Sequence, residues 1–116
     1  MTEPDCLFCR IAAGKLDADI VFQNDAVVAF RDINAQAPTH VLIIPRKHVA
    51  TINDLDSADA PIVGALFLAA QDIAEAAGIS DVGYRVVMNC NEGAGQSVFH
   101  IHLHMLGGRK LGWPPG

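Results

Sequence analysis

The sequence predicts an α+β fold: a single domain, a mainly antiparallel five-stranded sheet, one long helix packed on the sheet and a short N-terminal helix. Three observations support this class. The 116 residues, of which 51% are hydrophobic, suit one compact core, so we expect a single domain over residues 1–116. Several short β-branched or aromatic runs are bounded by turn residues, and one longer stretch has helical spacing instead.

The first half of the chain predicts a short helix followed by three strands. Residues 6–13 suit a helix that ends at Gly14, because glycine adopts the left-handed conformation beyond a helix end without steric cost. Ile20–Gln23 and Val27–Arg31 are strand-like runs close enough to form an antiparallel hairpin. Residues 40–45 are nearly all apolar and predict a third strand.

The second half predicts the long helix and two further strands. In residues 57–77 the apolar positions recur every three or four residues, and Gly78 follows, which indicates an amphipathic helix lying on the sheet. Those apolar positions are Ile62, Leu66, Ala69, Ile73 and Ala76. Residues 84–89 and 97–106 predict two strands joined by a loop over residues 90–96.

Composition narrows the functional classes. The formal net charge of -5 argues against binding a nucleic-acid polymer or an anionic membrane, because no basic stripe is present to release counterions. No apolar run approaches the roughly 20 residues needed to cross a bilayer, and the first residues are acidic rather than signal-like. Three cysteines do not form a paired framework, so we expect thiols and a cytoplasmic protein that binds a small ligand.

Three histidines at every second position carry most of the functional information. His100, His102 and His104 would share one face of an extended strand, with the intervening apolar residues on the other. Imidazole titrates near neutral pH, which favours a chemical role for the set. Zinc bound by all three is disfavoured, since a strand rising about 3.4 Å per residue separates the outer two by roughly 13 Å. We therefore expect the imidazoles to divide their roles.

Two further motifs leave alternatives open. Cys6 and Cys9 form a Cys-x-x-Cys motif that can ligate one metal if two more ligands join them. His48 and a histidine at one end of the triad are available as those ligands. A site closed by four protein ligands would be structural. A redox pair or two small buried cysteines would give the same motif. The glycine-containing loop over residues 89–97 is either an ordinary wide turn or, beside three histidines, a phosphate cradle.

The histidine pattern and several other segments together resemble the histidine triad family. Residues 100–106 are similar to its signature of histidines alternating with apolar residues. The remaining similar segments are Phe30-Arg31-Asp32-Ile33, Ala37-Pro38-Thr39-His40, Ile44-Pro45-Arg46-Lys47-His48, Gly95-Gln96-Ser97-Val98-Phe99-His100, Gly107-Gly108-Arg109 and Trp113-Pro114-Pro115-Gly116. They span essentially the whole chain and resemble the Hint-like branch, the purine nucleoside phosphoramidases.

This resemblance implies a catalytic set. His102 would be the nucleophile that attacks the α-phosphorus, forming a covalent nucleotidyl-histidine that water then hydrolyses. His40 and His104 resemble residues that contact the phosphate and orient or assist the nucleophile. Ser97 resembles the donor near the departing nitrogen, and Asn89 and Gln96 would complete the polar wall. Phosphoryl transfer rewards positioning and charge stabilisation, so no catalytic metal is expected.

The resemblance also implies where the nucleoside binds. Asp32 would accept hydrogen bonds from the ribose hydroxyls, beside Ile33. The residues that match the apolar purine slot are Phe8, Ile11, Leu16 and Phe30, although a plain core would explain them equally well. Asp17 departs from the family, which commonly has proline there, so the edge of the slot is expected to differ.

A structural zinc and a homodimer follow from the same resemblance. Some histidine triad proteins carry Cys-x-x-Cys with a downstream histidine and the first triad histidine, which here gives Cys6, Cys9, His48 and His100 as zinc ligands. Hint-like proteins are typically homodimers, and the proline-rich tail over residues 113–116 is suited to reaching a neighbouring subunit rather than remaining in solvent.

The leading functional hypothesis is hydrolysis of the P–N bond of purine nucleoside 5′-phosphoramidates, such as an adenosine monophosphate joined to an amine, with release of the nucleoside monophosphate. A dinucleoside polyphosphate hydrolase is the runner-up. A nucleotide-binding interaction module with little turnover is the alternative from another class. The polar set around His102 argues against the last, since binding alone needs no nucleophile-ready imidazole.

Overall fold

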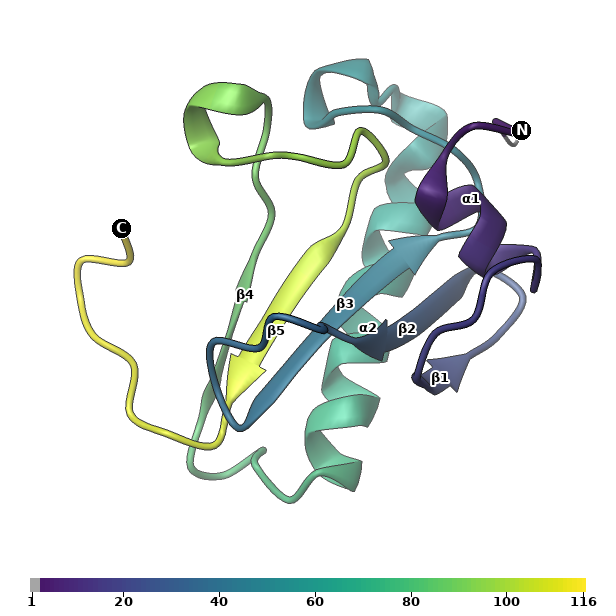
Figure 1. The fold of residues 1–116 in the computed structure, drawn as a ribbon. Helices are drawn as coiled ribbons and strands as arrows, with labels where there is room; N and C mark the ends of the chain where they lie inside the picture. Colours follow the sequence, from purple (N-terminus) through teal and green to yellow (C-terminus); the bar gives the residue numbers. More distant parts are fainter. Residues whose placement is uncertain (1–2) are drawn as a thin grey trace.

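The computed structural model describes residues 3–116 as one antiparallel sheet with a helix on each face (Figure 1). The sheet has the order β1-β2-β3-β5-β4. Its strands are β1 (Ile20–Gln23), β2 (Val27–Arg31), β3 (Thr39–Pro45), β4 (Tyr84–Val87) and β5 (Leu103–Gly107), and the helices are α1 (Leu7–Ala12) and α2 (Ala60–Ala76). The predicted fold class is confirmed. Among the described residues, no helix is both long and apolar enough to span a membrane.

The central strands are buried on both faces, which explains why residues 40–45 are nearly all apolar. In β2 and β3, Val27, Ala29, Val41 and Ile43 belong to the core beneath α2. The alternate residues, Val28, Phe30, Leu42 and Ile44, pack instead with Phe8 and Ile11 of α1. The two helices therefore cover opposite faces, because successive strand side chains point to opposite sides of the sheet.

Helix α2 begins later than the sequence pattern predicts. Ser57–Asp59 form a 3₁₀ turn, and the α-helix runs from Ala60 to Ala76. Asp56 and Asp59 cap each other's backbone N–H groups there, and buried Asp59 also accepts from Lys47 Nζ at 2.6 Å. These side-chain partners favour the tighter turn. The face packed on the sheet is formed by Leu66, Ala69, Ala70, Ile73 and Ala74, while Ala76 is exposed.

The strand predicted over residues 97–106 is wrong in its first half. Strand β5 begins at Leu103, so His100 and His102 precede the sheet. Its neighbour β4 ends at Val87, opposite His104, and Ile101 N–H instead donates to Val49 O at 2.8 Å. The predicted alternation nevertheless persists beyond the strand, because Ile101, Leu103 and Met105 all lie in the core beneath α2.

The other boundaries shift by a residue or two. Cys6 caps α1 rather than belonging to it, since its sulfur accepts from Cys9 N–H. Strand β3 starts at Thr39, one residue before the predicted start, and β4 ends at Val87 rather than at residue 89. The loop predicted over residues 90–96 contains the short 3₁₀ turn η3 (Glu92–Ala94). Gly14 has the predicted left-handed conformation, with φ of 74°.

Gly108, directly after β5, packs against the turn between β2 and β3. Its φ is +89°, and a Cβ placed there would lie 2.9 Å from Pro38 Cβ. We predict that Gly108→Ala lowers the free energy of unfolding by about 1–2 kcal/mol or more, since the left-handed conformation and the close contact both oppose a side chain. Urea denaturation measures the change.

Gly112→Ala is the matched control, because a Cβ at Gly112 meets nothing within 4 Å and its φ lies outside the left-handed range. Equal stability of the Gly108→Ala variant and the control would show that the contact between Gly108 and Pro38 does not constrain the turn.

Candidate functional site

A pocket of about 980 Å³ opens on the face of the sheet that carries α1. Apolar side chains from α1 and β2, polar groups from the loop before β5, and two of the triad histidines share its wall. The predicted site residues that line it are Phe8, Ile11, Leu16, Phe30, Asp32, Ile33, Asn89, Ser97, His102 and His104. The structure thus brings the residues expected for the nucleoside slot and the expected catalytic groups other than His40 into one cavity.

His102 is held with one ring nitrogen free. Its Nδ1 lies 2.8 Å from the carbonyl oxygen of His100, and because a carbonyl only accepts, Nδ1 carries the proton. The lone pair of the neutral ring is then on Nε2. Burial lowers the pKa of His102, so the ring is neutral at pH 7. Phe8 packs its ring nearly perpendicular to the imidazole at 5.0 Å between centroids, which restricts the imidazole further. These features suit a nucleophile.

His104 and His40 form a pair next to His102. The rings of His102 and His104 lie 5.0 Å apart, and His104 Nδ1 is 3.0 Å from His40 Nε2. His40 Nε2 also lies 3.3 Å from Asp32 Oδ2. Burial, followed by the neighbouring imidazoles, lowers the pKa of His104. His40 is buried behind His104 rather than on the pocket wall.

Gln96 does not line the pocket; its side chain holds the loop together instead. Its Oε1 accepts from Asn91 N–H at 2.7 Å, and its Nε2 donates to Ala50 O and Val98 O at 2.8 and 3.1 Å. Only 4% of Gln96 is exposed. Asn91 has a φ of 69°, a left-handed value that the bond from Gln96 helps to maintain. The neighbouring Gly95 and Ser97 do reach the pocket.

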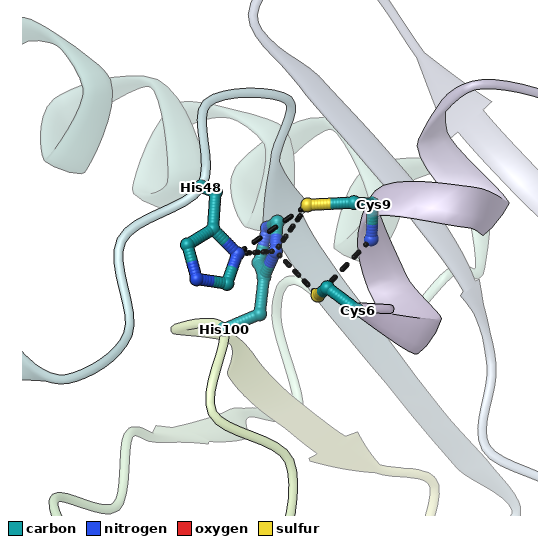
Figure 2. A group of neighbouring side chains, drawn as sticks. All are labelled: Cys6, Cys9, His48 and His100. Atoms are coloured by element: carbon teal, nitrogen blue, oxygen red, sulfur yellow. Dashed lines mark hydrogen bonds between the residues drawn. The ribbon is translucent and has the colours of Figure 1, made fainter. Parts of the chain in front are cut away.

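Four side chains that could hold a metal meet beside the pocket (Figure 2). Cys6 and Cys9 come from α1 and its cap, His48 follows β3, and His100 precedes β5. His100 Nδ1 lies 3.3 Å from Cys6 Sγ, 3.4 Å from Cys9 Sγ and 3.2 Å from His48 Nδ1, and Cys9 Sγ is 3.3 Å from His48 Nδ1. A tetrahedral zinc site with N and S ligands has edges of about 3.3–3.7 Å, so the donor set fits that metal.

His100 presents the correct nitrogen for ligation. Its Nε2–H donates to Pro45 O at 2.7 Å, which leaves the Nδ1 lone pair directed at the two sulfurs and His48. Burial lowers the pKa of His100 to about 4, so the imidazole is neutral at pH 7. Burial raises the pKa of the Cys9 thiol, an effect that a bound cation would oppose.

Some lining residues had not been singled out from the sequence. Leu42 lies on the face of β3 that packs with α1, and because it is two residues from His40, the period of two would have placed it there. Gln36 and Asn34 lie in the turn after β2, where the sequence gives no distinctive signal. Arg31 and Asp19 form a 3.1 Å ion pair at the pocket, a contact that only the β1–β2 pairing creates.

Comparisons with known proteins agree on one family. The HIT domain family profile matches residues 13–111, a span that begins after both cysteines of the Cys/His cluster. The purine nucleoside phosphoramidase of Escherichia coli K12 is 47% identical over 108 residues, covering 93% of this chain and 91% of that protein. A HIT family hydrolase from Legionella pneumophila has a TM-score of 0.95 and 54% identity, covering 97% of this chain and 100% of its own. A histidine triad protein from Clostridium difficile has a TM-score of 0.94 and 38% identity, covering 97% of both chains.

Proposed function

Because the chain belongs to the HIT domain family, we propose that it is a hydrolase of purine nucleoside 5′-phosphoramidates that cleaves their P–N bond and releases the nucleoside monophosphate. The observation that carries this proposal is the buried, neutral His102, whose Nδ1–H is held by the His100 carbonyl beside His104 in the pocket. The name of the 47% identical E. coli protein supports the choice of substrate class.

The first chemical step forms a bond between His102 Nε2 and the α-phosphorus. As that bond forms, the P–N bond of the substrate breaks, and its electron pair leaves with the amine nitrogen, which takes a proton from solvent. We assign Ser97, on the pocket wall, as the hydroxyl donor near this nitrogen. The modified ring keeps its Nδ1 proton and becomes cationic, a charge that the His100 carbonyl dipole stabilises.

The second step returns the enzyme to its starting state. Water attacks the phosphorus, the bond to His102 Nε2 breaks, and the neutral imidazole reforms as the monophosphate and a proton leave. His104 and Asn89, both on the pocket wall, are assigned to the phosphate oxygens. Asp32 is assigned to the ribose hydroxyls and Ile33 to the rim beside them. The apolar slot for the purine is formed by Phe8, Ile11, Leu16 and Phe30.

We assign a structural zinc ion to Cys6, Cys9, His48 and His100. The fit of the four donors and the lone pair on His100 Nδ1 support this assignment. The metal would contribute folding free energy by joining α1 to the segments that follow β3 and precede β5. The three cysteines are free thiols in the structure, which fits the cytoplasmic location we expect.

We also infer a homodimer built on the β4 side of the sheet. Strand β4 is an edge strand, so one row of its backbone groups is available for pairing (Figure 1). Phe67 and Leu68 on α2 are 49% and 63% exposed, which is unusual for large apolar side chains, and we assign them to the same interface. The tail starts along β4, where Arg85 Nη2 donates to Gly112 O and its guanidinium lies 5.9 Å from the Trp113 ring.

Replacing His102 tests the proposed reaction. His102→Asn should lower turnover of an adenosine phosphoramidate by at least about 10³-fold, because the covalent route is lost, whereas AMP binding measured by calorimetry should stay within a few-fold. Undiminished hydrolysis would contradict the covalent mechanism. With the wild-type protein, a clear preference for a dinucleoside polyphosphate would make the substrate assignment wrong, and binding without turnover of either compound would favour an interaction module.

Metal analysis tests the zinc assignment. Protein purified without added metal should contain one zinc per chain, and the Cys6→Ser/Cys9→Ser double variant should lose it. Its Tm should fall by about 10 °C, since losing about 2 kcal/mol of metal-linked stability shifts a domain of this size by several degrees per kcal/mol. Cys90→Ser is the matched control, because this third cysteine lies outside the cluster. If wild-type protein contains no zinc and has the same Tm as the double variant, the zinc assignment is wrong and the two cysteines only pack.

Sedimentation tests the oligomer. The wild-type chain should sediment at about twice the 12.3 kDa mass of one chain. Phe67→Asp/Leu68→Asp should sediment as a monomer, because the charges would be buried without partners. Ile20→Asp is the control, since Ile20 is similarly exposed but lies on β1 at the opposite edge. A monomeric wild-type protein, or a dimer lost equally in the control, would rule out the β4 side as the interface.

A further inference from the structure

Both ring nitrogens of the buried His40 lie within hydrogen-bond distance of a partner, and the partner of Nδ1 fixes which nitrogen carries the proton. Gln36 N lies 3.0 Å from His40 Nδ1. A backbone N–H only donates, so Nδ1 is an acceptor, and the single proton of a neutral imidazole must reside on Nε2. This Nε2–H faces His104 Nδ1 at 3.0 Å and Asp32 Oδ2 at 3.3 Å.

The tautomer of His40 determines that of His104. With a proton on His40 Nε2, a second proton on His104 Nδ1 would place two hydrogens against each other across 3.0 Å. His104 Nδ1 must therefore accept, and the proton of His104 resides on Nε2. Burial lowers the pKa of His104, so at pH 7 the ring carries one proton. Because His104 Nδ1 accepts from His40, that proton stays on His104 Nε2, the nitrogen that does not face His40. His104 lines the pocket.

The turn that supplies the Gln36 amide is exposed but braced from the end of β5. Arg109 Nε and Nη2 both donate to Gln36 O, at 3.2 and 3.0 Å. Within the turn, Gln36 Nε2 donates to Asn34 O and Asn34 N–H donates to Asp32 Oδ1. Arg109 follows Gly108, whose close approach to Pro38 holds the same turn. Arg109 is exposed and does not line the pocket.

We propose that the backbone amide of Gln36, braced by Arg109, is a positioning group that fixes the proton on His40 Nε2 and thereby keeps the proton of His104 on Nε2 for donation to substrate. The catalytic consequence rests on the function proposed above; the tautomers themselves do not.

One competing role for these residues is a second metal site. One donor atom each from Asp32, His40 and His104 lies within 4.8 Å of the others. Ligation through His40 Nε2 would move its proton to Nδ1, directly against the Gln36 N–H. The turn amide therefore opposes a metal here, whereas the hydrogen bond from His100 Nε2 to Pro45 O promotes ligation in the cysteine cluster.

Nitrogen-15 NMR of the histidine side chains tests the proposal without substrate. In the wild-type protein at pH 7, His40 and His104 should both show protonated Nε2 and unprotonated Nδ1. Gln36→Pro removes the amide proton and should give a tautomer mixture at His40, whereas Gln36→Ala keeps the amide and should keep the wild-type pattern. Added zinc should leave the His40 signals unchanged.

Arg109→Ala provides a second test should the proline variant fail to fold. It should give a partial shift in the same direction, with Arg85→Ala as the matched control, since Arg85 also donates to a backbone carbonyl of the C-terminal segment. We expect Gln36→Pro to lower kcat in proportion to the fraction of molecules with the wrong tautomer, with KM changed less than about threefold.

Several outcomes would overturn the proposal. A proton on His40 Nδ1 in the wild-type protein would do so at once, as would a wild-type pattern in Arg109→Ala and in folded Gln36→Pro. Zinc-induced shifts of His40 would favour the metal site. If the His40 tautomer shifts in a variant while kcat stays unchanged, the proposed role of the tautomer in catalysis is wrong. Absence of any turnover with the expected tautomers would instead count against the proposed function alone.

Discussion

The hydrogen bond from His102 Nδ1 to the carbonyl of His100 is the constraint on which the rest of the site depends. His100 is itself fixed at the other end, because its imidazole points one nitrogen into the cysteine cluster and the other at Pro45 O. One residue thus connects α1, the end of β3 and the start of β5. Since α1 also carries Phe8 against the His102 ring, the cluster and the pocket wall form one mechanical unit.

Much of the fold could be predicted because side-chain periodicity is a local property. The alternation that buries Ile101, Leu103 and Met105 is visible in the sequence and holds in the structure even where the strand does not. The start of β5 could not be predicted in the same way, since it depends on where its neighbour β4 ends. The 3₁₀ turn before α2 combines the local capping of Asp56 and Asp59 with a contact from Lys47, which the sequence pattern does not show.

The candidate site was predictable to the extent that its residues belong to contiguous motifs. Resemblance supplied the pocket histidines and the four Cys and His residues that could hold a metal, and the structure gathers both sets. It could not show that His40 lies behind His104, or that the Gln96 amide turns inward to Ala50 O and Val98 O, because those partners come from other segments. The role of the Gln36 amide could not be predicted for a further reason, because every residue except proline has the same backbone N–H.

The pairing of β3 with β5 places Leu42 opposite His104 and Val41 opposite Met105, with the pocket and the main core on opposite sides of the same two strands. A slip of one residue would exchange these roles, driving imidazoles into the aliphatic interior and aliphatic side chains into the pocket. Such a chain would lose its chemistry and its core together. A one-residue register shift between these strands would therefore cost stability and activity together, rather than activity alone.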